Sequence, residues 1–178
     1  YRGTPLQNSF SINMVALDDG VPKTMTLKES LDCWVDHQIN IFTRRTQYRL
    51  DRAQHELHIN EGLLKAIGLI DEVISAIRSS EDRAAARNLL MDVPFEFSEI
   101  QTNHILDMQL VRLTRLGKST LQERMQELSL IIADLEAILS DESKIKSVIK
   151  EELLKWKEKF STPRITEFIP DPGELDIE

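Results

Sequence analysis

The stretch LQERMQELSLIIADLEAIL, from Leu121 to Leu139, decides the fold of this chain. Its apolar residues are spaced 4, 3, 4, 3 and 4 positions apart, the repeat that aligns one face of a helix along a coiled coil. The residues of this seam are Leu121, Met125, Leu128, Ile132, Leu135 and Leu139. A seam of this kind has to be covered by a second helix, so the sequence predicts a two-helix arm.

The partner helix is expected upstream, in residues 28–60. Thr26 stands three positions before Glu29, the spacing of a capping box, and no proline follows until well past Arg78. Gly62 and Gly68 weaken a helix locally, so one long helix and two consecutive helices both fit this segment. Because the seam leaves the region that the earlier helix enters, the two are predicted to pair antiparallel.

Residues 61–117 lie between the two arm helices and are predicted to form a compact helical knob. Apolar residues become denser from Leu63 to Ile77, and a further helix is expected from Ser98 to Leu116. From Ile105 onward, that helix carries two adjacent rows of apolar side chains along its length instead of one. A helix of this kind meets two partners, and we expect one to be the knob itself and the other a second copy of the chain.

The two ends of the chain complete a mainly α fold. Residues 1–27 contain a β-hairpin, with alternating strands on either side of an Asp18-Asp19-Gly20 turn. Residues 118–162 hold the returning arm helix and a final helix, and residues 163–178 form an acidic, proline-bearing linker. The final helix is expected to pack back on the hairpin end through Ile145, Ile149, Leu153, Trp156 and Phe160.

The amino-acid composition argues against several classes of protein. The 178 residues are 41% hydrophobic and carry a formal net charge of −8, which argues against nucleic-acid binding over the whole surface. The single cysteine excludes an internal disulfide or a cysteine metal cluster and is typical of a reducing compartment. No apolar run approaches the roughly 20 residues that span a bilayer, so no membrane partner is expected.

No constellation of residues predicts an active site. His55 and His58 are one helical turn apart, but no third ligand at a suitable spacing accompanies them, so no metal site is predicted. The isolated Gly62 and Gly68 match no phosphate-binding loop, and Tyr1 and Tyr48 lack neighbours that would activate a nucleophile.

The strongest basic cluster is Arg44, Arg45, Arg49 and Arg52, which surrounds Tyr48 and is a candidate for a weak contact with DNA phosphates. Glu56 and the acidic returning helix offer these arginines partners within the chain, so a charged flank of the arm is the favoured interpretation.

A set of motifs in one order resembles the A subunit of bacterial DNA gyrase, a type IIA topoisomerase, with the A-type subunit of topoisomerase IV as a close second. They cover nearly the whole chain, and together at these separations they are highly specific. The motifs are Leu6-Gln7-Asn8-Ser9-Phe10 with Asn13-Met14, Thr43-Arg44-Arg45-Thr46, His58-Ile59-Asn60-Glu61-Gly62-Leu63, Ile70-Asp71-Glu72-Val73-Ile74 through Ile77-Arg78, Ile105-Leu106-Asp107-Met108-Gln109-Leu110 with Arg112-Leu113-Thr114, and Arg164-Ile165-Thr166-Glu167. Thr43-Arg44-Arg45-Thr46 and the acidic tail favour gyrase.

The resemblance implies that the chain is the end of the DNA breakage-reunion region. Residues 1–27 would be the edge of the tower domain, followed by a coiled-coil arm and a globular exit-gate knob. Two knobs would meet across a two-fold axis at the gate through which a transported duplex leaves. By position, the residues nearest that dimer contact are Ile105, Leu106, Met108, Gln109, Leu110, Arg112 and Leu113.

The resemblance also implies which parts of the enzyme lie elsewhere. The nucleophilic tyrosine would lie upstream of Tyr1, so this fragment alone should be inactive although its parent is an ATP-hydrolysing topoisomerase. The fragment would hold no cofactor, because ATP and Mg²⁺ would be bound by the partner B subunit. Duplex DNA and the B subunit would be reached through other parts of the parent. Such a protein would be cytoplasmic and associated with the chromosome.

Two other hypotheses remain beside the homodimeric gate. An autonomous coiled-coil adaptor would bind a foreign helix through the seam and would not need the knob. A nucleic-acid-binding arm would use Arg44 to Arg52 and would show steep salt dependence, although the net charge of −8 predicts that such binding is weak.

Overall fold

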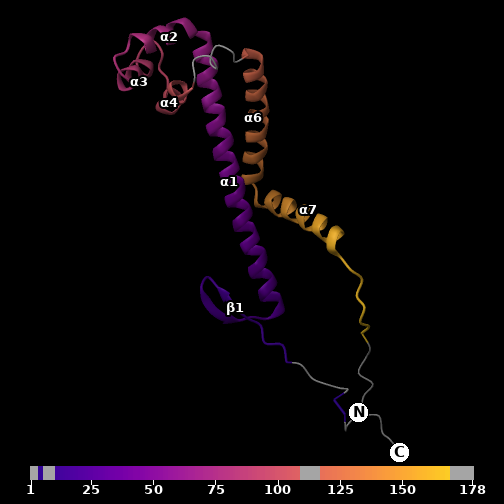
Figure 1. The fold of residues 1–178 in the computed structure, drawn as a ribbon. Coiled ribbons are helices and arrows are strands. Elements are labelled where there is room, and N and C mark those ends of the chain that lie inside the picture. Colours follow the sequence, from indigo (N-terminus) through magenta and orange to yellow (C-terminus); the bar gives the residue numbers. More distant parts are fainter. Residues whose placement is uncertain (1–3, 6–10, 109–116, 169–178) are drawn as a thin grey trace, which may run out of the picture.

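The computed structural model describes residues 4–5, 11–108 and 117–168. A two-stranded hairpin leads into a long helix, which ends in a group of short helices at its far tip, and a second helix returns alongside the first (Figure 1). The prediction of a mainly α chain with an N-terminal hairpin is confirmed.

The hairpin consists of β1 (Val15–Asp18) and β2 (Val21–Thr24), paired antiparallel with Val15 opposite Thr24. Asp19 and Gly20 connect the strands, and both have positive φ angles, 48° and 81°. This is the backbone that a two-residue hairpin turn needs, and Gly20 adopts it without steric cost. The predicted Asp-Gly turn is therefore confirmed.

Helix α1 (Leu27–Gly68) is a single helix of 42 residues, about 60 Å long at 1.5 Å per residue. Thr26 caps it, and the predicted capping box with Glu29 is present. Gly62 lies inside the helix without interrupting it, whereas Gly68 is its last residue. Of the two arrangements that the sequence allowed, one helix therefore continues to Gly68, and α2 (Ile70–Ser79) follows after Leu69.

Helices α2, α3 (Arg83–Met91) and α4 (Glu99–Asp107) gather on one side of the far end of α1 and form, with its last turns, what we call the lobe (Figure 1). Its core combines residues from all of these helices, from the segment before α4 and from the first turn of the returning helix. The buried members are Leu63, Ala66, Val73, Ala76, Leu90, Phe95, Phe97, Ile105 and Leu121.

The helix predicted from Ser98 to Leu116 begins as expected, because Ser98 forms a capping box with Gln101. The prediction is wrong about its length: α4 ends at Asp107, and Met108 is extended with φ −80° and ψ 139°. Met108 is partly buried against the lobe core, so the chain leaves the helix while still covering apolar surface. The periodic pattern registers the apolar residues but not the break in the helix at Met108, and residues 109–116 of the predicted helix lie outside the described residues.

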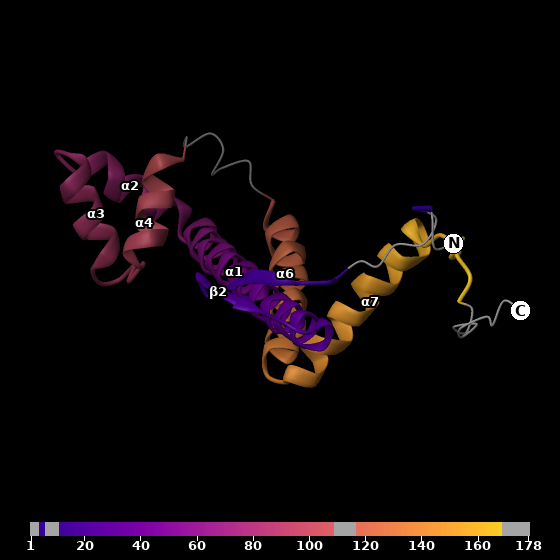
Figure 2. The same cartoon turned by 90° about the horizontal axis from the view of Figure 1, so that it is seen from below.

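Helix α6 (Lys118–Leu139) lies alongside α1 and runs in the opposite direction, and the two form the arm (Figure 1). Helix α7 (Glu142–Phe160) then leaves the arm at an angle (Figure 2). Helix α7 is expected to pack on the hairpin end, but its main contacts are with α1 and α6, and Ile145 near its start is buried. Leu153, Trp156 and Phe160 are exposed because α7 diverges from the arm along its length.

Candidate functional site

The lobe at the tip of the arm contains the first part of the predicted dimer contact. Ile105 is buried in the lobe core, and Leu106 and Met108 are partly buried against the same core. Gln109, Leu110, Arg112 and Leu113 lie outside the described residues. Of the three described positions, Ile105 therefore serves the lobe itself, while Leu106 and Met108 retain some exposed surface.

The outer surface of the lobe carries apolar side chains that its core does not cover. Leu89 and Met91 on α3, Val93 after it and Ile100 on α4 are all exposed. Exposed apolar residues are ordinary when scattered, but these four belong to one small group of helices at the tip of the arm. The surface is therefore suited to apolar contact with another molecule.

The lobe is fixed to the arm by a close contact between α4 and α1. A Cβ atom at Gly62 would lie 2.6–2.9 Å from Cγ, Cδ and Cβ of Gln101, so the glycine makes room for that side chain. Gln101 Nε2 donates to the His58 carbonyl oxygen at 2.8 Å, and Ser98 Oγ shares a hydrogen bond with His58 Nε2 at 2.7 Å. The contact explains why α1 has a glycine inside a helix, a place where glycine is otherwise unfavourable.

The same contact gives His58 a structural role. Its ring nitrogens lie within hydrogen-bond distance of Ser98 Oγ and Gln101 Nε2, at 2.7 and 3.5 Å. Among the described residues, no group of three or more histidine, cysteine, aspartate or glutamate side chains could hold a metal ion.

The six seam positions of α6 are all at least partly covered. Leu121 and Leu128 are buried, and Met125, Ile132, Leu135 and Leu139 are half-buried. On the facing side of α1 the buried residues include Phe42, Thr46, Leu50 and Ala53. Thr46 continues this buried row through the Thr-Arg-Arg-Thr segment, where the apolar stripe in the sequence is thin.

Ion pairs between helices flank this packing. Arg124 of α6 donates through Nε to Oε1 of Glu56 on α1 at 2.8 Å. Arg45 of α1 pairs through Nη2 with Oε1 of Glu152 on α7 at 2.7 Å, and its guanidinium lies 4.7 Å from the centre of the Phe42 ring. Both pairs are partly exposed, so each orients helices more than it stabilises them.

The basic cluster of the sequence is therefore divided by the fold. Arg45 is engaged between α1 and α7, whereas Arg44, Arg49 and Arg52 are exposed. The interpretation that Glu56 serves these arginines is wrong, because Glu56 pairs with Arg124. Arg124 reaches Glu56 from α6, across the arm interface.

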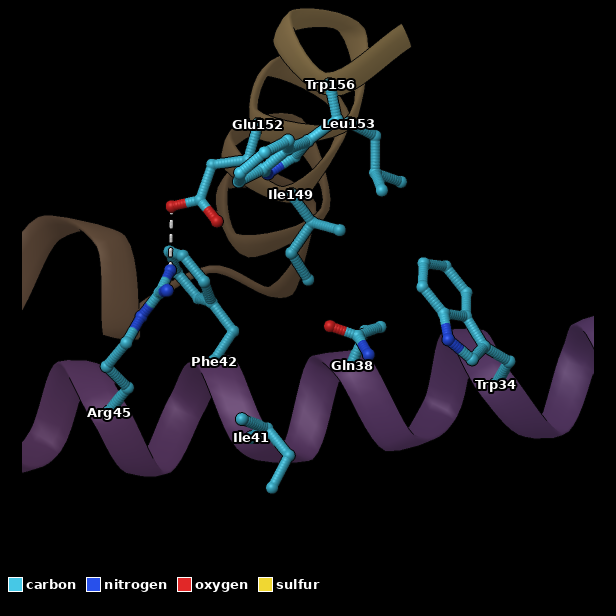
Figure 3. A pocket seen from close by; sticks show the side chains of 9 residues that line it. All are labelled: Trp34, Gln38, Ile41, Phe42, Arg45, Ile149, Glu152, Leu153 and Trp156. Carbon is cyan, nitrogen blue, oxygen red and sulfur yellow. Dashed lines mark hydrogen bonds and ion pairs between the residues drawn. The ribbon is translucent and has the colours of Figure 1, made fainter. Parts of the chain in front are cut away.

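A cleft of about 230 Å³ lies between the first half of α1 and α7 (Figure 3). Trp34 and Ile41 line it from α1, and Leu153 and Trp156 line it from α7. Its charged residues, Arg45 and Glu152, pair with each other at one end (Figure 3). The lining is thus mostly apolar, and its carboxylate is paired with Arg45, so the cleft serves the packing of α7 on α1.

The perturbed pKa values also lie at structural positions. Hydrogen bonding to the Asp18 carboxylate raises the pKa of the Cys33 thiol, which disfavours the reactive thiolate. Hydrogen bonds from the backbone and side chain of Thr26 lower the pKa of Glu29, which strengthens the cap of α1. Neither shift prepares a group for catalysis.

No helix in the described part of the chain is long and apolar enough to cross a membrane.

Comparison with known proteins and protein families shows which proteins the chain resembles. A family model for the A subunit of DNA gyrase/topoisomerase IV matches residues 1–154. The chain is 43% identical over 178 residues to the DNA gyrase A subunit of Streptomyces coelicolor, covering 100% of this chain and 21% of that protein. It is 46% identical over 166 residues to the DNA gyrase A subunit of Halalkalibacterium halodurans, covering 93% of this chain and 20% of that protein.

A topoisomerase IV protein is similar to the chain over the same region. The A subunit of DNA topoisomerase 4 from Staphylococcus aureus is 39% identical over 178 residues, covering 100% of this chain and 22% of that protein. The chain thus spans about a fifth of the length of the curated relatives it matches.

Proposed function

Because this chain belongs to the family of DNA gyrase and topoisomerase IV A subunits, we propose that it forms the arm and the exit-gate contact of a type IIA topoisomerase. Two copies would meet through their lobes across a two-fold axis, and the joined lobes would close the path of a transported duplex. The observation that carries the proposal is the position of the lobe. It sits at the far end of α1, a helix about 60 Å long, with uncovered apolar side chains on its outer surface.

The shape supports a gate because contact at the tips leaves the rest of the arms free to stand apart. A two-fold contact uses the same patch on both copies, so a small apolar surface on each lobe can be complementary to itself. The contact has to part during each cycle, which favours an apolar centre of modest area over a large permanent interface.

The parent enzyme would supply the chemistry. We propose that this chain alone cleaves no DNA, and that the duplex to be cleaved and the partner B subunit engage the parent through its other regions. ATP and Mg²⁺ would act there and not in the arm. The higher identities, 43% and 46% against 39%, favour a gyrase parent over a topoisomerase IV parent.

The test is the solution mass of the chain by light scattering over a dilution series. The gate predicts a species of twice the 20.5 kDa chain mass. Met108→Glu should convert it to the monomer, because a charge at the edge of an apolar contact is costly to bury. Leu130→Glu, at an exposed position of the arm, is the matched control and should remain dimeric.

Circular dichroism separates loss of contact from loss of fold. A Met108→Glu variant that keeps its helix content and remains dimeric would refute the placement of the contact. A chain that is monomeric at every concentration would refute a gate contact carried by this region alone. If Leu130→Glu separates the copies, the arms and not the lobes hold the dimer.

A further inference from the structure

Three arginines on α1 form an exposed surface with no partner in the described chain. Arg44, Arg49 and Arg52 make no ion pair or hydrogen bond among the described residues, whereas Arg45 is bound to Glu152. Other described cations, such as Lys150 and Lys155 on α7, also make no ion pair among the described residues, but these three arginines gather on one short stretch of α1 in a molecule whose formal net charge is −8. A local positive surface on an acidic protein calls for a functional explanation.

The arrangement of these side chains is linear. Arg44, Tyr48 and Arg52 are four residues apart, so they form one ridge along the exposed face of α1. Tyr48 is 61% exposed and lies between the two arginines along the helix. His55 continues the ridge by one turn, and Arg49 stands beside it.

The acidic groups near the ridge are mostly engaged elsewhere. Glu56 is bound to Arg124 across the arm, at 2.8 Å. Asp51, the carboxylate closest to the ridge in the helical repeat, accepts a hydrogen bond from Gln47 Nε2 at 2.8 Å. Asp51 reduces the local charge without pairing with an arginine, so the ridge retains a positive excess.

We propose that this ridge, Arg44-Tyr48-Arg52 with Arg49, binds the phosphate backbone of duplex DNA. Arg44 and Arg52 are about 12 Å apart along the helix at 1.5 Å per residue, close to the width of the major groove of B-DNA. Their guanidinium groups can therefore reach phosphates on both sides of one groove. Tyr48 can donate a further hydrogen bond to a phosphate oxygen between them.

The inference rests on the proposed function, since a duplex that leaves through the gate would pass along the arms. A contact of two or three phosphates is weak and independent of sequence, so it would guide a passing duplex without retaining it. The acidic remainder of the chain would confine DNA to the ridge through repulsion.

The experiment is fluorescence anisotropy of a labelled random-sequence duplex titrated with the chain at about 20 to 200 mM salt. The test variant is Arg44→Gln/Arg49→Gln/Arg52→Gln. The control is Lys150→Gln/Lys155→Gln/Lys157→Gln, which removes the same charge from exposed positions on α7. Circular dichroism and light scattering establish that each variant has the fold and assembly state of the parent chain.

The ridge predicts that duplex affinity falls at least about tenfold in the arginine variant and that the slope of log affinity against log salt decreases by about 2 to 3. The lysine variant should bind like the parent chain. Equal losses in the two variants, unchanged binding in the arginine variant, or no binding by the parent chain at 20 mM salt would each overturn the proposal. So would equal binding of polyglutamate, which would indicate an acidic protein partner.

The mass measurement keeps this inference separate from the gate. A dimer whose arginine variant binds DNA as well as the parent chain would refute the ridge alone. A monomer that binds DNA through the ridge would refute a gate contact carried by this region alone and preserve the phosphate contact.

Discussion

Gly62→Ala should destabilise the chain, although alanine is the better helix former. In a helix interior the exchange would ordinarily gain about 1 kcal/mol. Here the new Cβ would lie 2.6–2.9 Å from three carbons of Gln101, including the Cβ that is fixed to the backbone of α4. Rotation of the glutamine end cannot relieve the overlap, so α4 has to move away from α1.

The magnitude follows from three contributions. Overpacking of a tight contact costs about 1–3 kcal/mol. Loss of the hydrogen bond from Gln101 to the His58 carbonyl, now 2.8 Å long, costs about 1 kcal/mol. The gain in helix propensity offsets about 1 kcal/mol, which leaves a net loss of about 1–3 kcal/mol.

Gly68→Ala is the matched control, because a Cβ at Gly68 meets nothing within 4 Å. It should be neutral or stabilise the chain by up to about 1 kcal/mol. Urea unfolding followed by circular dichroism gives both free energies, and hydrogen exchange should show faster opening of α4 in Gly62→Ala only. In the double variant with Gln101→Ala, the two losses should sum to less than their separate values. A stabilised Gly62→Ala variant, or equal effects at both glycines, would refute the contact.

Two further predictions concern the arm. Leu128→Ala should lower the free energy of unfolding by about 2–5 kcal/mol in a urea titration, because Leu128 is only 2% exposed. Leu130 is 70% exposed, so Leu130→Ala should change the free energy of unfolding by less than about 0.5 kcal/mol in the same titration. The cap of α1 should weaken in acid, because hydrogen bonds from Thr26 lower the pKa of the Glu29 carboxyl. The cap therefore stabilises the folded chain at pH values above 4.5, the ordinary pKa of glutamate, and this stability is lost as the pH falls through the lowered pKa of the folded state. An NMR titration of the Glu29 carboxyl should have its midpoint below 4.5, and a midpoint at or above that value would contradict the capping box.

Local patterns predicted the features that depend on neighbouring residues. The Asp-Gly turn, the capping box of α1 and the start of α4 at Ser98 depend on residues within three positions of one another, and the structure confirms them. The alternating spacing of four and three residues between apolar positions predicted which face of α6 is covered, because the helical repeat is the same whatever surface the helix packs against. The domain limits stay predictions, and α1 passes through the expected limit at 60/61 without a break.

The features that the sequence did not reveal are side-chain contacts between residues far apart in the chain, where each residue had several possible partners. Glu56 had several arginines within reach of its helix, and surface ion pairs differ in energy by less than about 1 kcal/mol. Only the position of α6 brings Arg124 to it. The contact between Gly62 and Gln101 was missed for a similar reason, although a glycine inside an otherwise strong helix was its one local sign.

The same contacts limit how the proposed gate can open. Helix α1 runs without interruption from the arm into the lobe, and Leu63 and Ala66 near its end belong to the lobe core. Leu121 belongs to that core as well and also begins the seam of α6. Bending the lobe on the arm would therefore disrupt both the core and the Gly62 contact, each of which is closely packed. If two lobes meet as proposed, they part most readily when each arm moves as a unit with its lobe, and the motion has to originate at the base of the arms.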